Sequence, residues 1–347
     1  MDYRAKNLDG LRGLAIIMVI IHHLNLLYVG VLPLNNPLYD LIKITQYGPT
    51  GVNLFFLISG FVISNSLEKN NDLIFLKKRW LRLFPSMLAV TIVILIFSYN
   101  IILENHHVHN TSLLNILTGI FFFDPQILRE VFGINVTSLS GIFWSLYVEV
   151  KFYLIIYFLY KFFKDNSRHW IAILYLSYVV FKYLNIYFPD EKIFASMIEN
   201  ARLLSLSYFS WFATGIYFFY YTKNNSKFDL LLCILFGFLS SLHAGRLHDF
   251  SVIFFSLFII SLFIFSFKNI FLNKFFSNYF FIFFGLISYP LYLLHDGFVY
   301  IYLRRFQIIF GENYIYLNIF SSFIVMLIVS FLITFFIEKN ITKKRSI

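Results

Sequence analysis

Apolar segments of about twenty residues recur along the whole chain, and this spacing constrains the fold more than any other feature. A transmembrane helix needs ~20 predominantly apolar residues to cross the hydrocarbon core of a bilayer. Ten such segments can be marked, at residues 8–29, 48–66, 83–103, 142–163, 170–187, 202–221, 228–242, 250–267, 280–302 and 314–337. We therefore expect an all-α, polytopic integral membrane protein with about ten transmembrane helices.

Composition agrees with a chain that lies mostly in lipid. Of the 347 residues, 59% are hydrophobic and 13% are charged, whereas soluble domains carry about 25% charged residues. No polar block is long enough to fold separately, so we expect a single membrane domain over residues 1–347 and no separate soluble domain. The net charge of +10 does not indicate a nucleic-acid partner, because the basic residues lie in short loops between apolar segments.

The distribution of Lys and Arg predicts the orientation. Ten spans place both termini on one side of the membrane, and that side carries 18 of the 28 basic residues, against six in the opposite loops. Cytoplasmic loops carry the excess of Lys and Arg in membrane proteins. We therefore predict that both termini are cytoplasmic, with Arg304 and Arg305 as the main exceptions to the charge rule.

The first apolar segment contains ionisable residues along one face. Charged or ionisable groups in hydrocarbon are unfavourable unless they face a cavity or a partner. Arg12 and His23 are eleven residues apart, which is about three helical turns plus ~20°, so both project from one face roughly 16 Å apart. Asp9 precedes Arg12 by three residues and can pair with it. His22 points ~100° away from His23 and is expected to contact another helix.

Glu149 and His295 are predicted at about the same depth as His23, each roughly 10 Å from the outer end of its helix. A buried imidazole beside a carboxylate is held in one tautomer and is a better proton acceptor. We therefore expect a polar cavity in which these three groups could deprotonate a hydroxyl nucleophile. For each histidine alone, an interhelical hydrogen bond is the alternative role.

Arg79 and Arg82 are spaced so that both guanidinium groups can point the same way. Side chains at i and i+3 of a helix are neighbours, and guanidinium groups bind phosphate bidentately. This pair could therefore hold a phosphate near the cytoplasmic face. The alternative is an anchor in which both side chains extend to lipid headgroups.

The second segment combines small and polar residues. Gly51 and Gly60 allow close approach of neighbouring helices, and Asn53 is a candidate to line the cavity because an amide in lipid needs a partner. The outer stretch 104–141 contains Asp124-Pro125 and Gly133, which argue against one long helix. Either a cap over the cavity or a passive linker is consistent with this stretch.

No metal site is expected. His106 and His107 are adjacent and cannot share one helical face, and together with His109 they complete no known ligand spacing. The one cysteine, Cys233, lies in an apolar segment and supports neither a disulfide nor a redox motif.

Five motifs occur in an order that resembles the membrane-bound acyltransferase-3 family of bacterial O-acyltransferases. They are Arg12-x10-His23, residues 51–61 (GVNLFFLISGF), Arg79-x-x-Arg82 followed by Pro85, residues 144–149 (WSLYVE) and residues 288–295 (SYPLYLLH). The sequence departs from the family pattern after Glu149, where Val150 and Lys151 stand, and after His295, where Asp296 and Gly297 stand.

The resemblance implies transfer of a short acyl group, usually acetyl, from cytoplasmic acyl-CoA such as acetyl-CoA to a hydroxyl of a lipid-linked glycan or surface polysaccharide. It implies that His23 is the catalytic base, supported by Glu149. Arg12, Arg79 and Arg82 would hold coenzyme A, and Asn53 and Ser145 are candidates to stabilise the tetrahedral intermediate. It also implies a location in the bacterial cytoplasmic (inner) membrane, among membrane lipids.

Two other classes of protein remain open. A transporter or flippase of a sugar or anionic lipid also needs ionisable residues within the membrane, although no internal repeat or discontinuous-helix pattern is evident. In a receptor or scaffold, the polar stripe would only hold helices together. Direct transfer and an acyl-histidine intermediate, the acceptor sugar and the oligomeric state are not distinguished by the sequence.

Overall fold

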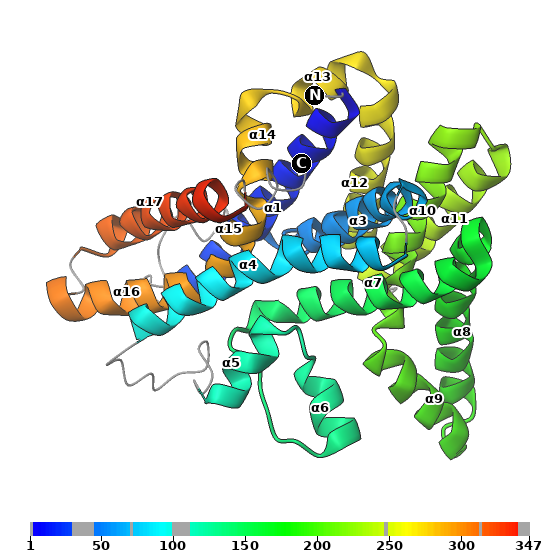
Figure 1. Ribbon diagram of the computed structural model, residues 1–347, viewed down its shortest axis with the longest axis horizontal. Helices are drawn as coiled ribbons and strands as arrows, with labels where there is room; N and C mark the ends of the chain where they lie inside the picture. The colour runs from blue at the N-terminus through cyan, green and yellow to red at the C-terminus, as the bar shows by residue number, and fades with distance from the viewer. Residues whose placement is uncertain are drawn as a thin grey trace. The chain divides into compact units, whose positions relative to one another are not determined.

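The structure, a computed structural model, describes residues 3–29, 45–69, 72–98, 112–245, 249–311 and 314–338. Within these ranges the regular structure is helical and contains no β-strand, so the all-α prediction is confirmed (Figure 1). The first half of the chain forms α1 (Tyr3–Val29), α3 (Thr50–Lys69), α4 (Asp72–Ser98), α5 (Leu113–Ile120), α6 (Pro125–Phe132), the 3₁₀ turn η2 (Gly141–Phe143) and α7 (Trp144–Phe163).

The second half is also helical within the described ranges. It forms the 3₁₀ turn η3 (Lys164–Asn166), α8 (Ser167–Tyr187), α9 (Lys192–Leu203), the 3₁₀ turn η4 (Leu206–Tyr208), α10 (Phe209–Asn224), α11 (Lys227–Ala244), α12 (Phe250–Lys268), α13 (Ile270–Phe276), α14 (Tyr279–Leu286), α15 (Ser288–Leu294), α16 (Gly297–Phe310), α17 (Ile315–Ile333) and the π-helical turn η6 (Thr334–Glu338).

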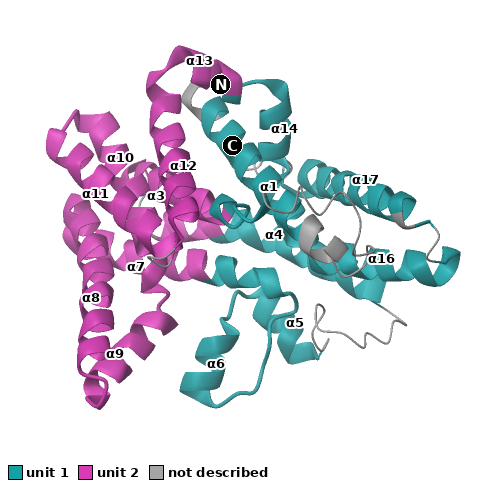
Figure 2. Ribbon diagram, turned by 180° about the vertical axis from the view of Figure 1, so that it is seen from behind, with its two compact units in different colours: residues 1–51, 80–147, 276–347 teal, residues 52–79, 148–275 magenta. Residues whose placement is uncertain are grey.

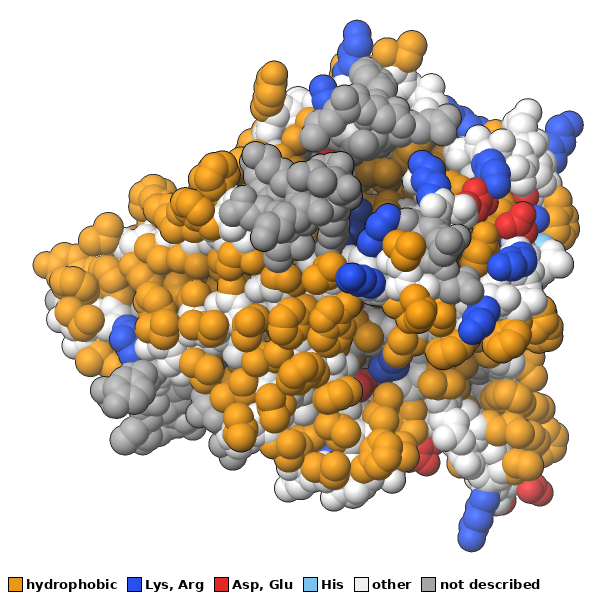
Figure 3. Space-filling model, in the orientation of Figure 1, with side chains coloured by type: hydrophobic (Ala, Val, Ile, Leu, Met, Phe, Trp, Pro, Cys, Tyr) orange, Lys and Arg blue, Asp and Glu red, His pale blue; other side chains and the backbone are white. Residues whose placement is uncertain are grey.

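Six helical stretches of the described chain are long and apolar enough to cross a membrane. They are Thr50–Lys69, Leu73–Ser98, Gly141–Tyr187, Lys227–Ala244, Phe250–Lys268 and Tyr316–Glu338. Large apolar side chains on them are exposed, for example Ile96 at 63% and Phe254 at 69%, and hydrophobic side chains cover much of the visible surface (Figure 3). Exposed apolar side chains in such numbers are suited to lipid rather than water. The protein is therefore a polytopic membrane protein.

The described residues form two compact units, coloured separately in Figure 2. Unit 1 comprises residues 1–51, 80–147 and 276–347, and unit 2 comprises residues 52–79 and 148–275. The expectation of one domain over residues 1–347 stays a prediction.

In unit 1, glycines bring α1 into close contact with Phe276, the last residue of α13, and with α14. A Cβ atom added at Gly10 would lie 1.7 Å from the backbone oxygen of Phe276, and one added at Gly13 would lie 2.0 Å from that of Phe281. From the other side, a Cβ at Gly285 would lie 1.8 Å from the backbone oxygen of Asp9. Glycine alone permits this packing because it has no Cβ atom. The contact with α14 therefore fixes the position of the polar face of α1.

Residues 104–111 of the outer stretch lie outside the described residues; residues 112–141 contain α5 and α6 and pack along α4, also within unit 1. Asp124 caps α6, Pro125 is its first residue, and Gly133 ends it in the left-handed conformation (φ 67°), so the predicted turns are confirmed. The rings of Trp80 and Phe122 lie 5.6 Å apart. Trp80 is roughly 27 Å along α4 from Ser98, so residues 112–123 reach far along α4. Whether the stretch is a cap over the cavity or a passive linker stays a prediction.

The ninth apolar segment, predicted as one helix over 280–302, is instead broken into α14, α15 and the start of α16. Pro290 has no N–H to donate to the carbonyl of Leu286, so a continuous helix would lose a hydrogen bond at that turn. A second break lies at Asp296, whose ψ of −81° departs from helical geometry. The short helix α15 is buried and ends at Leu294, which places His295 at a helix end inside unit 1.

In unit 2, aromatic side chains fill the space between α3, α7, α10 and α12. Phe152 and Phe212 stack with ring centroids 3.9 Å apart, and Phe61 lies within 6.0 Å of Phe263. A Cβ at Gly60 would lie 2.2 Å from the backbone oxygen of Phe212, so the close approach predicted for Gly60 is confirmed. In Figure 1, α7 and α8 meet at a corner, formed by η3 with Lys164 at φ 48°.

Candidate functional site

His23 lies on α1 with one ring nitrogen engaged by the backbone. Its Nδ1 is 3.0 Å from the carbonyl oxygen of Val19, one turn earlier. A carbonyl oxygen only accepts hydrogen bonds, so Nδ1 carries the proton in this contact and Nε2 is left as an acceptor. The local helix therefore holds His23 in the tautomer that a proton acceptor at Nε2 requires.

His295 lies beside His23, as the predicted depths suggested. The two ring centroids are 4.6 Å apart and the planes meet at 83°. Nδ1 of His295 is 2.5 Å from the carbonyl oxygen of Tyr292, so its Nε2 is again the acceptor. His295 is fully buried, and its Nε2 has no hydrogen-bond partner among the described residues.

A buried polar cluster continues from His295 into the polypeptide before α7. The hydroxyl groups of Tyr292 and Ser145 are 2.7 Å apart, and Tyr292 also donates to the carbonyl oxygen of Ile142 at 3.2 Å. Ser140 donates to the Asp296 carboxylate at 3.1 Å. These contacts link α15, α16 and α7 around the two histidines within unit 1.

Arg12 and His22 of α1 have partners as well. Arg12 donates to Asp9 at 2.9 Å, so the predicted pair is present. His22 binds the carbonyl oxygen of Thr45 through Nδ1 at 2.7 Å, and a Cβ at Gly48 would lie 2.1 Å from the His22 Cβ. His22 therefore contacts a distant part of the chain, in agreement with the structural role predicted for it.

Glu149 is held by two hydroxyl groups within unit 2. Ser59 of α3 donates to Glu149 Oε1 at 2.7 Å, and Tyr153, one turn later on α7, donates to the same oxygen. The guanidinium carbon of Arg79 lies 5.9 Å from the centre of the Tyr153 ring. Arg79, Tyr153, Glu149 and Ser59 thus form one connected set. The support of His23 by Glu149 stays a prediction.

Arg82 lies on α4 three residues after Arg79, and it has an acidic neighbour in unit 1. The Glu338 carboxylate accepts a hydrogen bond from Ser86 at 2.7 Å, and Arg82 interacts electrostatically with the same carboxylate. The i, i+3 spacing on one helix agrees with the sequence. The role of the pair in binding phosphate is untested.

Lys151 and Asn53 differ in whether their side chains form hydrogen bonds. The Lys151 ammonium donates to the carbonyl oxygen of Leu203 at 2.7 Å and to Ser205 at 2.9 Å, so this departure from the family pattern caps the C-terminal end of α9. Asn53 is partly buried and forms no side-chain hydrogen bond within the described part of the chain. Its place in a cavity stays a prediction.

Sequence reasoning missed the two tyrosines of these clusters. Tyr153 follows Glu149 by four residues and Tyr292 precedes His295 by three, so both lie on the same helical face as an ionisable group. That spacing could have identified them. No group of three metal-ligating side chains occurs among the described residues, and His106, His107 and His109 lie outside them.

Comparison with known proteins identifies the family. Residues 6–339 match the sequence profile described as an acyltransferase domain. The chain therefore belongs to the acyltransferase-3 family of membrane proteins. No solved structure matches the chain.

Curated relatives match part of the chain. It is 32% identical over 161 residues to the peptidoglycan O-acetyltransferase OatA of Listeria monocytogenes, a stretch that covers 43% of this chain and 23% of that protein. It is 31% identical over 162 residues to nodulation protein 10 of Rhizobium leguminosarum bv. viciae, which covers 43% of this chain and 42% of that protein. The matched stretch thus spans less than half the length of either relative.

Proposed function

We propose that this protein transfers a short acyl group, in the simplest case acetyl, from acyl-CoA to a hydroxyl group of a cell-surface or lipid-linked carbohydrate. The observation that carries the proposal is the His23–His295 pair, in which His295 is fully buried and backbone contacts leave the Nε2 atoms of both rings as acceptors. The family supports acyl transfer, and the name of one relative supports a glycan acceptor.

The proposed reaction follows from the tautomer of His23. Its Nε2 takes the proton of the acceptor hydroxyl as the hydroxyl oxygen attacks the thioester carbonyl carbon. A new C–O bond forms, and the C–S bond breaks when the tetrahedral intermediate collapses. The imidazolium returns the proton to the departing thiolate, so the products are the ester and free coenzyme A.

His295 supplies a second acceptor beside the proposed base. A fully buried nitrogen without a partner is unfavourable by about 1–3 kcal/mol, and a donor group on a bound substrate would remove that penalty. A second hydroxyl of a sugar is one such donor. His295 would then orient the acceptor while His23 takes the proton.

The donor is proposed to reach the site from the cytoplasm. Arg12, Arg79 and Arg82 are the candidates to bind the phosphates of coenzyme A, because guanidinium groups suit phosphate geometry. Asp9 lies against Arg12 and Glu338 interacts with Arg82, so bound phosphates would compete with these carboxylates. Residence in the bacterial inner membrane with cytoplasmic termini is part of the same proposal.

The test is acyl transfer in reconstituted vesicles. Purified protein receives acetyl-labelled acetyl-CoA and a lipid-linked glycan extract, and label in the glycan is measured. His23→Ala is expected to lower transfer by about 10²–10⁴-fold, the range for loss of a general base. His22→Ala is the matched control, because its imidazole binds the Thr45 carbonyl instead, and it is expected to retain transfer.

Two results would reject the proposal. Equal transfer by wild type and His23→Ala would remove His23 from the role of base. If the wild type neither transfers label to the glycan nor hydrolyses the thioester, acyl transfer itself is rejected.

A transporter is the second candidate, and one observation favours it. The breaks at residues 287 and 295–296 make α14, α15 and α16 a discontinuous helix, a feature of many transporter binding sites. This removes one sequence argument against transport. Movement of unmodified glycolipid across the vesicle membrane, without ester formation, would support the alternative.

A further inference from the structure

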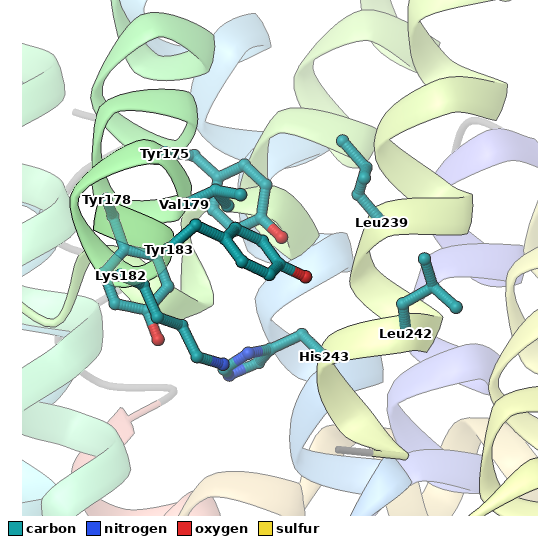
Figure 4. Close-up of a pocket in the computed structure, with 8 residues that line it drawn as sticks. All are labelled: Tyr175, Tyr178, Val179, Lys182, Tyr183, Leu239, Leu242 and His243. Atoms are coloured by element: carbon teal, nitrogen blue, oxygen red, sulfur yellow. The ribbon is translucent and has the colours of Figure 1, made fainter. Parts of the chain in front are cut away.

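A cavity of about 370 Å³ lies between α8 and α11 of unit 2, and none of its lining residues belongs to the candidate acyl-transfer site. The lining residues are Tyr175, Tyr178, Val179, Lys182 and Tyr183 from α8, and Leu239, Leu242 and His243 from α11. In Figure 4, the side chains of Lys182 and Tyr183 extend from α8 toward α11, from which His243 extends in return.

The two helices run side by side in the same direction. Arg168 pairs with Asp229 at 3.3 Å near their first turns, and the rings of Tyr175 and Phe236 lie 6.1 Å apart farther along. Tyr178 and His243 follow at 6.3 Å. The cavity therefore lies toward the C-terminal ends of both helices, at the opposite end from the Arg168 pair.

The two ends of this helix pair differ in charge compensation. At the first end, the Arg168 guanidinium has the buried Asp229 carboxylate as its partner. At the cavity, the eight lining residues include Lys182 but no carboxylate. Lys182 forms no ion pair or hydrogen bond with another described residue. A half-buried ammonium group beside apolar helices favours an anion from outside the chain.

Hydrocarbon-facing side chains adjoin the cavity on both helices. Val180 and Ile186 of α8 are 54% and 59% exposed, and Ile234 and Phe238 of α11 are 56% and 47% exposed. Both helices lie in stretches apolar enough to cross a membrane. A ligand with one anionic group and a hydrocarbon chain could place the anion at Lys182 while its chain lies along these side chains.

We propose that this cavity binds the phosphate group of a membrane lipid, with Lys182 as the cation and the phenol groups of Tyr175, Tyr178 and Tyr183 available as hydrogen-bond donors. The phosphate could belong to an anionic phospholipid or to a polyprenyl phosphate of the kind that carries glycans. Binding requires no acyl transfer, so the inference stands independently of the proposed function.

The test measures lipid retention by the full chain in phosphatidylcholine nanodiscs. Dioleoyl phosphatidylglycerol and undecaprenyl phosphate are the anionic probes, undecaprenol is the neutral comparator, and retained probe per protein is quantified by mass spectrometry. Lys182→Ala is expected to weaken retention of the phosphate-bearing probe about fivefold, as for one lysine near an anionic lipid. Lys182→Arg keeps the charge and is expected to retain binding.

Lys192→Ala is the matched control, because Lys192 is an exposed lysine on α9 outside the cavity lining. If retention of only one anionic probe depends on Lys182, the inference is supported and that probe identifies the class of lipid bound. If retention of both anionic probes depends on Lys182, the inference is supported and the cavity recognises the phosphate alone. Equal retention by wild type and Lys182→Ala, or retention of undecaprenol equal to that of its phosphate, would overturn the inference. Circular dichroism and gel-filtration profiles of the variants verify that they are folded.

Discussion

Backbone carbonyl groups select the tautomer of three neighbouring histidines. His22, His23 and His295 each direct Nδ1 at a carbonyl oxygen, so each ring has Nε2 as its acceptor. The three rings form a chain with centroids 5.3 and 4.6 Å apart. The partners of His23 and His295 are three or four residues earlier in the chain and follow from local helical geometry, whereas the partner of His22 is Thr45, 23 residues away, and depends on the tertiary structure.

At the same scale, the hydroxyl group of Tyr153 is predicted to contribute to acetyl transfer through its hydrogen bond to Glu149. Tyr153→Phe removes one of the two donors to Glu149, and hydrogen bonds to a charged group contribute about 1.5–3 kcal/mol. If Glu149 takes part in transfer, kcat/KM of acetyl transfer should fall roughly tenfold or more.

Tyr157→Phe is the matched control for that variant. Both tyrosines lie 6.5 Å from the ring of Phe75, but the Tyr157 hydroxyl has no hydrogen bond among the described residues. The control is expected to keep wild-type activity. Equal activities of the two variants would show that the contact with Glu149 does not contribute to transfer.

At the scale of elements, the packing of α1 on α14 is predicted to limit stability. Gly13→Ala would place Cβ against the backbone oxygen of Phe281 in α14 at 2.0 Å, and backbone cannot move aside as a flexible side chain can. The variant should lose about 1–3 kcal/mol of stability, seen as a lower midpoint of thermal unfolding in detergent.

Gly141→Ala serves as its control, since an added Cβ at Gly141 has no heavy atom within 4 Å. Its unfolding midpoint should stay close to that of the wild type. An unchanged midpoint for Gly13→Ala would mean that α1 and α14 do not pack as the structure describes.

At the scale of the whole molecule, the predicted orientation can be tested by labelling. Cys233 is buried on α11, so a Cys233→Ser background allows single cysteines to be introduced at exposed positions. Asp190→Cys lies between α8 and α9, on the predicted outer side, and Asn224→Cys lies at the end of α10, on the predicted cytoplasmic side.

A membrane-impermeant maleimide applied to intact cells should label Asp190→Cys and label Asn224→Cys only after lysis. The reverse labelling pattern would show that the predicted orientation is inverted. Labelling of both cysteines in intact cells would contradict the number of membrane spans between them. The common direction of α8 and α11 agrees with the predicted outward course of both segments.

The sequence by itself determined the class of protein and the residue types of the site. Hydrocarbon admits only backbone that satisfies its own hydrogen bonds, so long apolar segments specify transmembrane helices without reference to any partner. Rare ionisable residues in such segments, such as His23 and Glu149, are for the same reason candidates for function. The Asp9–Arg12 pair was predictable because it depends on helical spacing alone.

Only the tertiary structure decided which groups meet across the sequence. The breaks at Ile287 and Asp296 turned one predicted helix into three and placed His295 against His23. The chain around Phe121 and Phe122 folded back to Trp80. The Ser59 and Tyr292 hydroxyl groups acquired their partners in the same way. Such contacts depend on how packed elements exclude lipid and satisfy buried polar groups, and a one-dimensional spacing does not specify that packing.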